Sequence, residues 1–126
     1  MRTILIVDDS PTIRRMVRAS LDNLFATAFS EAASGLQAIE TLAVSPVDLV
    51  ILDLNMPDMH GLDVLRFVRS HQHYRDVPVM ILTTRGDQSS RDAAGRAGAS
   101  AYLTKPFMPA ALIASVRGLL PRELDV

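Results

Sequence analysis

The chain has 126 residues and a formal net charge of −1, with 48% hydrophobic and 21% charged residues. A chain of this length buries enough surface to form one stable domain, and this composition is typical of a folded globular protein rather than a disordered one. The absence of cysteine excludes disulfides and thiolate chemistry, and the near-neutral charge argues against a dedicated nucleic-acid binder.

The first half of the chain alternates strand and helix patterns. Residues 4–7 form an apolar, β-branched run that predicts a strand buried on both faces. Apolar side chains then recur at helical spacing over residues 13–24. A weaker strand is expected at residues 27–31. The helix that follows starts with the capping-box pattern Ser34-Gly35-Leu36-Gln37 and is stopped by Pro46.

The second half continues this alternation, and two of its runs are again apolar and rich in β-branched residues. In chain order the predicted elements are strand 49–52, helix 61–71, strand 79–82, helix 87–97, strand 100–104 and helix 109–121. Repeated strand–helix units predict an α/β fold, (βα)5, whose doubly wound parallel sheet is covered by helices on both faces. We expect residues 1–126 to form a single domain.

No apolar run approaches the ~20 residues needed to span a bilayer. The N-terminal apolar run is also too short for a signal peptide, because the acidic pair Asp8-Asp9 interrupts it. We therefore expect a cytoplasmic protein that does not contact the membrane.

Polar side chains follow four of the predicted strands. Asp8 and Asp9 come after the first strand, Asp53 after the third, Thr83 after the fourth and Lys105 after the fifth. Because ligands of parallel sheets bind beyond the carboxyl ends of the strands, we expect these side chains to converge. Each has an ordinary explanation by itself, such as helix N-terminal charge or turn chemistry. Their convergence from four segments favours a functional site.

The residue types at this edge indicate metal-dependent phosphoryl transfer. Three carboxylates would repel one another unless a cation intervenes, and Mg²⁺ prefers oxygen ligands. Lys105 is the single lysine beside twelve arginines, and its compact ammonium suits a small acidic pocket. A carboxylate can act as the nucleophile in such a site and form an aspartyl-phosphate. Asp53, at the end of a central strand, is the best candidate.

The motifs around these residues extend along the chain. They are Asp8-Asp9, Asp53-x-x-Met56-Pro57-x-Met59-x-Gly61, Thr83 and Gly98-Ala99-x-x-Tyr102-Leu103-x-Lys105-Pro106-Phe107. Together they resemble the receiver domain of two-component response regulators. The resemblance covers the whole chain and is strongest to stand-alone, CheY-like receivers without an output domain. It implies the flavodoxin-like strand order 2-1-3-4-5 and a cis bond before Pro106.

The resemblance also implies roles for the site residues. Asp53 would accept a phosphoryl group from a phosphohistidine on a sensor histidine kinase or phosphotransfer protein. Asp9, Asp53 and the main-chain carbonyl of Asn55 would bind Mg²⁺, with Asp8 acting mainly through water. Lys105 would pair with Asp53 and then with the phosphoryl group.

The resemblance further implies a conformational switch formed by Thr83 and Tyr102. The hydroxyl would move toward the phosphate, and the aromatic ring would turn inward. Thr84 stands where the family usually has a small residue, so we expect it to narrow the approach to Asp53.

The surface of the fourth helix, fifth strand and fifth helix would bind a target protein, and chemotaxis is one candidate pathway. Residues 85–118 carry more basic than acidic side chains, whereas residues 1–84 carry more acidic ones. We therefore hypothesise an acidic or mixed target surface. No nucleic-acid partner is expected, and the protein is expected to be a monomer.

Two other classes use related folds. A Mg²⁺-dependent phosphatase with an aspartyl nucleophile, of the haloacid-dehalogenase type, needs a second Asp where this chain has Asn55. An FMN-binding, flavodoxin-like electron carrier needs a Ser-, Thr- and Gly-rich phosphate loop where this chain has Asp8-Asp9-Ser10-Pro11. The phosphatase is the main alternative to a phosphoacceptor switch. The switch is not an enzyme in the usual sense, although it could promote its own phosphorylation and dephosphorylation.

Overall fold

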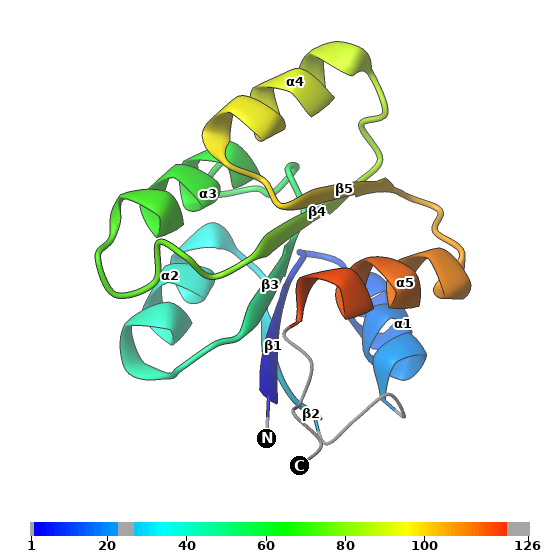
Figure 1. Ribbon diagram of the computed structural model, residues 1–126, viewed down its shortest axis with the longest axis horizontal. Coiled ribbons are helices and arrows are strands. Elements are labelled where there is room, and N and C mark those ends of the chain that lie inside the picture. The colour runs from blue at the N-terminus through cyan, green and yellow to red at the C-terminus, as the bar shows by residue number, and fades with distance from the viewer. Residues whose placement is uncertain (1, 23–26, 121–126) are drawn as a thin grey trace.

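The computed structural model describes residues 2–22 and 27–120, in which strands and helices alternate as predicted (Figure 1). The elements are β1 (Arg2–Val7), α1 (Pro11–Leu21), β2 (Thr27–Ala32), α2 (Gly35–Val44), β3 (Leu49–Leu52), α3 (Gly61–Ser70), β4 (Val79–Thr83), α4 (Gln88–Ala97), β5 (Ala101–Thr104) and α5 (Pro109–Leu119). The predicted helical positions 23 and 24, and Pro121, lie outside the described residues. No helix in the described ranges is long and apolar enough to cross a bilayer.

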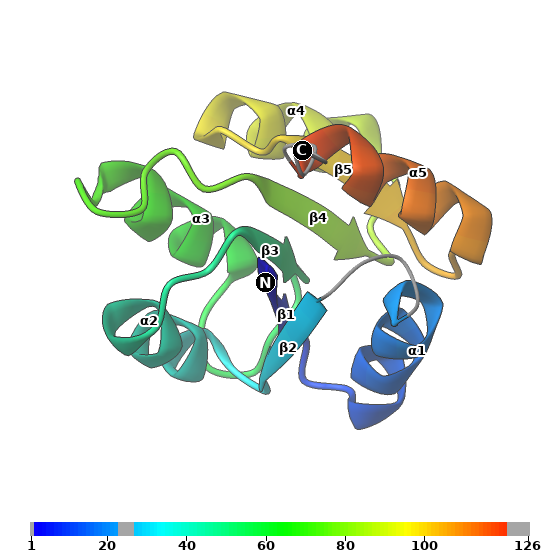
Figure 2. The ribbon, with the colours of Figure 1, turned by 60° about the horizontal axis from the view of Figure 1, so that its bottom comes forward.

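Within the described residues the five strands form one parallel sheet in the order β2-β1-β3-β4-β5 (Figure 2). The expected doubly wound α/β fold and its strand order are therefore confirmed. The chain leaves β1 toward β2 on one side and later returns to place β3 on the other. In such sheets this change of direction opens a crevice beyond the carboxyl ends of the two inner strands, here β1 and β3.

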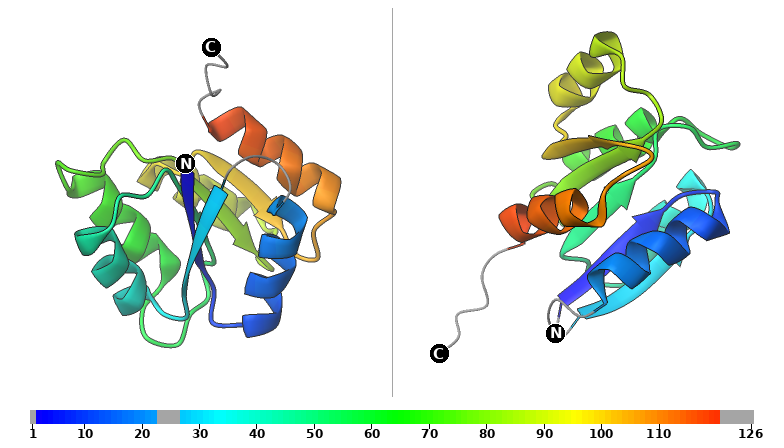
Figure 3. Two further views of the ribbon diagram at one scale, coloured as in Figure 1. Left: turned by 90° about the horizontal axis from the view of Figure 1, so that it is seen from below. Right: turned by 90° about the vertical axis from the view of Figure 1, so that its right-hand side faces the viewer.

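Each face of the sheet has its own hydrophobic core, because successive side chains of a strand point to opposite faces. In β1, Leu5 and Val7 face the core under α2, α3 and α4, whereas Ile4 and Ile6 face the core under α1 and α5. All four are essentially inaccessible to solvent. Figure 3 shows the two helical layers on opposite sides of the sheet. This double coverage explains why β1, β3 and β4 contain continuous apolar runs.

Two local predictions need correction. Met16 belongs to the apolar pattern predicted over residues 13–24, but it is 46% exposed, because α1 buries only the narrower stripe of Val17 and Leu21. The capping box at α2 is only half formed. The Ser34 hydroxyl accepts from the Gln37 N–H at 3.1 Å, but the Gln37 amide oxygen accepts from the N–H of Ala33 instead of that of Ser34.

Candidate functional site

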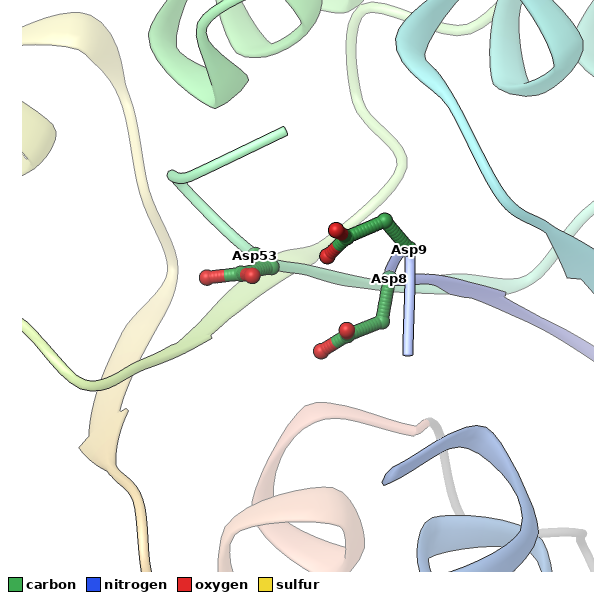
Figure 4. A group of neighbouring side chains, drawn as sticks. All are labelled: Asp8, Asp9 and Asp53. Carbon is green, nitrogen blue, oxygen red and sulfur yellow. The ribbon is translucent and has the colours of Figure 1, made fainter. Parts of the chain in front are cut away.

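Three carboxylates meet beyond the carboxyl ends of β1 and β3 (Figure 4). One oxygen from each of Asp8, Asp9 and Asp53 lies within 4.8 Å of the other two. Asp8 and Asp53 are buried, whereas Asp9 is exposed to solvent. The sheet produces this arrangement directly, because Val7 pairs with Leu52 and the Asp53 N–H donates to the Val7 carbonyl at 3.0 Å. The three acids therefore lie close together beyond the strand ends, as predicted.

The Asp8 residue is held through both its main chain and its side chain. Its N–H donates to the Ala32 carbonyl at 3.0 Å, and its carboxylate accepts from the Ser10 N–H at 2.9 Å. The carbonyl of Asp8 accepts from the guanidinium of Arg14 at 2.6 Å. These bonds fix the start of the loop that carries two of the three acids.

Lys105 lies across the acid pair rather than against one acid. Its ammonium donates to an Asp8 oxygen at 2.6 Å and lies 3.3 Å from an Asp53 oxygen, and its side chain is 9% exposed. The resemblance led us to expect the pair with Asp53, but the shorter contact is with Asp8. The Lys105–Pro106 bond is cis, as expected.

The charges of the site are not balanced by protein groups. Among the described ion pairs of the three carboxylates, the ammonium of Lys105 is the one cation, and it contacts only Asp8 and Asp53. Burial raises the pKa of the Asp8 carboxyl above its ordinary value, and the hydrogen bond from Lys105 opposes that rise. Clustered carboxylate oxygens with excess negative charge are the donor set that a hard divalent cation prefers. The residues present therefore fit a Mg²⁺ site.

Asn55 lies in the loop after β3, two residues beyond Asp53, and its N–H donates to an Asp53 oxygen at 3.3 Å. Its side chain is exposed, so the residue meets the site through its main chain. The expected role of the Asn55 main-chain carbonyl as a Mg²⁺ ligand stays a prediction.

Thr83 ends β4 and is fully buried, whereas Thr84 is exposed. The Thr83 hydroxyl accepts from the Arg85 N–H at 3.4 Å, and its carbonyl accepts from the Lys105 N–H at 2.8 Å. The structure thus resolves which of the two adjacent threonines points inward. The bond from the Lys105 N–H also joins the end of β4 to the end of β5.

Tyr102 lies on β5 with its ring partly buried. Its hydroxyl donates to the carbonyl of Arg85 at 2.5 Å, and the guanidinium of Arg91 lies 4.8 Å from the centre of the ring. Burial raises the pKa of the Tyr102 hydroxyl, and the charge of Arg91 opposes the rise. The main chain of Arg85 therefore contacts both expected switch residues, Thr83 and Tyr102.

Three further residues support the site, and two of them, Arg14 and Asp58, were not predicted from the sequence. Arg14 binds the Asp8 carbonyl, as described above. Both oxygens of Asp58 accept main-chain N–H groups at the start of α2, each at 3.0 Å, and tie the loop after β3 to that helix. Gly61 belongs to the quoted motif, and a Cβ there would lie 2.3 Å from the Asp53 carbonyl oxygen. Charged residues on helices and loops are too common for their contacts to be predicted from sequence.

Comparison with known proteins decides the family. The chain matches the response regulator receiver domain over residues 4–117. It belongs to this family. Over 110 residues it is 38% identical to the chemotaxis protein CheY1 of Helicobacter pylori, a match that covers 86% of this chain and 89% of that protein.

Solved structures of receivers have the same fold. The structure of the chemotaxis response regulator CheY4 of Vibrio cholerae is 32% identical, with a TM-score of 0.88 over 95% of this chain and 99% of that one. The Mn²⁺-bound form of the response regulator Rcp1 is 28% identical, with a TM-score of 0.82 over 97% of this chain and 100% of that one. This receiver is thus similar to chemotaxis proteins in both sequence and fold.

Family membership narrows the functions considered from the sequence. Receivers of this kind are generally signalling switches of two-component systems rather than classical enzymes, and they bind Mg²⁺ at an acidic pocket. They act with histidine kinases and target proteins. In this receiver, Asp8, Asp9 and Asp53 form a cluster of carboxylates that could hold a metal ion.

Proposed function

We propose that this receiver is a Mg²⁺-dependent phosphoacceptor whose phosphorylated form binds a target protein. The observation that carries the proposal is the cluster of Asp8, Asp9 and Asp53 with Lys105 across it, at the crevice of the sheet. A phosphohistidine on a sensor kinase or phosphotransfer protein would be the donor. The similarity to proteins named for chemotaxis supports chemotaxis as the pathway in which this receiver acts.

Asp9, Asp53 and the main-chain carbonyl of Asn55 would hold Mg²⁺, with Asp8 acting through bound water. The Mn²⁺-bound relative supports a divalent cation in a receiver of this fold. When bound, the cation neutralises charge that develops on the transferred phosphoryl group. The clustered carboxylates supply the negative charge that retains it.

Asp53 is the proposed nucleophile. One of its carboxylate oxygens attacks phosphorus, the P–N bond to the donor imidazole breaks, and the imidazole leaves after taking up a proton. The product is an acyl phosphate on Asp53. Lys105 already lies 3.3 Å from an Asp53 oxygen, so its ammonium can turn from Asp8 to the new phosphoryl oxygens.

The contacts of Arg85 suggest how the new charge would be transmitted. A phosphoryl group adds about −1.5 to −2 charge and three acceptor oxygens. The Thr83 hydroxyl, which now accepts from the Arg85 N–H, would turn and donate to one of them. Arg85 would lose that acceptor and shift, and its carbonyl would release the Tyr102 hydroxyl. The ring could then turn inward, which biases the loop between two conformations.

The target would bind the surface formed by α4, β5 and α5. Basic side chains outnumber acidic ones over residues 85–118. Arg85 is exposed on the loop before α4, and Arg91 covers the Tyr102 ring. A target segment with acidic side chains would therefore meet complementary charge at the place where the switch acts.

The decisive experiment uses acetyl phosphate with Mg²⁺ and intact-mass analysis. We expect the native protein to gain one phosphoryl group, and Asp53→Asn or added chelator to prevent the gain. Asp63→Asn is the matched control, because Asp63 is an exposed acid on α3 outside the pocket, and it should be modified like the native protein. An unchanged native mass would contradict the proposal. Repeated turnover of a small phosphate ester would favour the phosphatase instead.

The single lysine provides a second test of the site. Lys105→Arg keeps the charge but replaces a compact ammonium, 9% exposed, with a broader planar group. We expect this variant to lose phosphorylation-dependent binding of target, because the guanidinium cannot lie across both acids in the same space. Normal phosphorylation and target binding by Lys105→Arg would show that the lysine is not required.

A further inference from the structure

Arg14 is a charged residue that contacts the loop after β1, which carries Asp8 and Asp9. It lies on α1, and Figure 3 shows that this helix runs beside β1 and β2. One end of its guanidinium, Nη1, donates to the Asp8 carbonyl at 2.6 Å, and Nε donates to a Glu31 oxygen at 2.9 Å. Its side chain is only 15% exposed. Arg14 therefore connects β2 to the loop that follows β1.

The Asp8 main chain is held from two directions by the same part of β2. Its N–H donates to the carbonyl of Ala32, and its carbonyl accepts from Arg14, which is anchored on Glu31. Glu31 and Ala32 are adjacent on β2 and pair with the last residues of β1. The Asp8 carbonyl belongs to the peptide that joins Asp8 to Asp9. The guanidinium consequently fixes the plane of the peptide between two of the clustered acids.

We propose that Arg14, anchored by Glu31, is a positioning residue for divalent-cation binding at Asp8, Asp9 and Asp53. This inference rests on the proposed metal site. With the peptide held, the two acids already lie within 4.8 Å of Asp53 before a cation arrives. Without the bond from Arg14, the loop that carries Asp8 and Asp9 must be ordered when the cation binds, which lowers the affinity for the cation. Partners that orient metal ligands typically change metal affinity about 10- to 100-fold when they are replaced.

The geometry calls for arginine rather than any cation. Nε and Nη1 lie on one rigid plane and point to different acceptors, Glu31 and the Asp8 carbonyl. A lysine ammonium at the same position would keep the charge on a flexible chain without that planar fork. Arg14→Lys therefore separates positioning from charge.

A purely electrostatic role predicts the opposite result. A positive charge near the cluster repels a divalent cation, so its removal would strengthen cation binding. Under that explanation Arg14→Ala would bind the cation more tightly, and Arg14→Lys would match the native protein. If Arg14 instead positions the loop, both Arg14→Ala and Arg14→Lys bind the cation more weakly than the native protein.

The chain offers a matched control in Arg18. It also pairs with Glu31, at 3.1 Å, but its side chain is 51% exposed and its described hydrogen bond is to Glu31 alone. Arg18→Ala removes a charge near Glu31, Arg18→Lys keeps it, and both leave the bond from Arg14 to the Asp8 carbonyl in place. Arg18→Lys and Arg18→Ala should therefore retain native cation affinity.

The test is the dissociation constant for Mn²⁺, measured by electron paramagnetic resonance of the free ion, and for Mg²⁺ by competition, with no phosphodonor present. We expect Arg14→Lys and Arg14→Ala to weaken binding about tenfold, at the lower end of the usual range. The backbone amide of Asp9 should also shift in the NMR spectrum of metal-free Arg14→Lys. Circular dichroism confirms that the measured samples are folded.

Native affinity in Arg14→Lys, or tighter binding in Arg14→Ala, would overturn the inference. Equal weakening by Arg18→Ala would overturn it as well, because the effect would then follow the charge near Glu31. Failure of the native protein itself to bind either cation would contradict the proposed metal site. The two failures are therefore distinguishable.

Discussion

The acid site and the α4–β5 region are held by different kinds of contact. The strands that carry the acids, β1 and β3, are buried almost throughout, and hydrogen bonds from three directions hold Asp8. By contrast, β5 is only partly buried along its length, and Ala94 is the one buried residue of α4, which lies wholly in the described part of the chain. The acid site is therefore anchored in the cores, whereas the neighbouring α4–β5 region is not.

The small side chains of α4 explain the difference. Its sequence is dominated by alanine, serine and glycine, and it buries little apolar surface, which limits the free energy that packing can contribute. Polar contacts hold the region instead, including the bond from Tyr102 to Arg85 and the Asp87 cap at the start of α4. Regions with few buried contacts open most easily. A charge added at Asp53 should therefore move α4 and β5 rather than the acids.

The largest effect expected from this comparison is that of Gly61→Ala. Its Cβ would lie 2.3 Å from the Asp53 carbonyl oxygen and 2.7 Å from the Leu54 Cα, both main-chain atoms that cannot rotate away. We expect the free energy of unfolding to fall by about 3 kcal/mol, the upper end of the usual range for overpacking. Urea denaturation provides the measurement.

Gly95→Ala is the matched control in the α4 region. Its Cβ would meet nothing within 4 Å, and the position is helical and exposed. Alanine should raise the free energy of unfolding by about 0.5 to 1 kcal/mol, because glycine has the greater conformational entropy to lose on folding. Similar losses in both variants would show that the two regions are packed alike.

A smaller effect is expected from relieving repulsion within the acid site. Asp53→Asn removes one of three clustered negative charges. We therefore expect the free energy of unfolding of the metal-free protein to rise by about 1 kcal/mol, which is within the usual gain from a single stabilising substitution. Thermal unfolding with and without Mg²⁺ measures this. Saturating Mg²⁺ stabilises the native protein and should remove the advantage of the variant. A metal-free Asp53→Asn protein less stable than the native one would show that the acids do not strain the fold.

The smallest expected effect concerns the Asp87 cap of α4 and its dependence on pH. The N–H and hydroxyl of Ser90 donate to Asp87 and lower the pKa of its carboxyl below the ordinary 3.8. Because the pKa is lower in the folded state, the stabilisation is fully present above the unfolded pKa and is lost as pH falls through the folded one. Asp87→Ala should therefore reduce stability at neutral pH, and the difference from the native protein should shrink below pH ~4.

Asp87→Asn is the control for that titration, since it keeps a capping oxygen but has no carboxyl group. Urea denaturation of Asp87→Asn and Asp87→Ala at neutral and acidic pH compares the two. Their stability difference should stay nearly constant with pH, whereas each should change relative to the native protein. A native-to-Asp87→Ala difference that is the same at all pH values would contradict the role of the charged cap.

Several features of the fold and site could be predicted because they depend on local patterns or on a general rule of parallel sheets. The apolar runs of β1, β3 and β4 lack alternation because both faces are covered, and that absence is visible in the sequence. The convergence of Asp8, Asp9 and Asp53 follows because parallel strands end at the same edge. The reach of the ammonium of Lys105 into this edge follows in the same way, once the fifth strand is placed beside the fourth.

Other features could not be predicted, because they depend on distances between elements far apart in the sequence. The nearness of Lys105 to Asp8, 97 positions away, is set by the packing of β5 and the loop after β1. The bond from Arg14 to the Asp8 carbonyl depends on how α1 packs beside β2. The exposure of Met16 depends on the width of the stripe that α1 buries.

The sequence by itself determined the element order, the two-sided burial of the sheet and the set of acids, because periodicity and strand ends are local properties. Only the tertiary structure decided which groups contact one another around those acids. Long polar side chains such as those of Lys105, Arg14 and Asp58 can reach many partners. The packing of the surrounding helices and strands selects one of them.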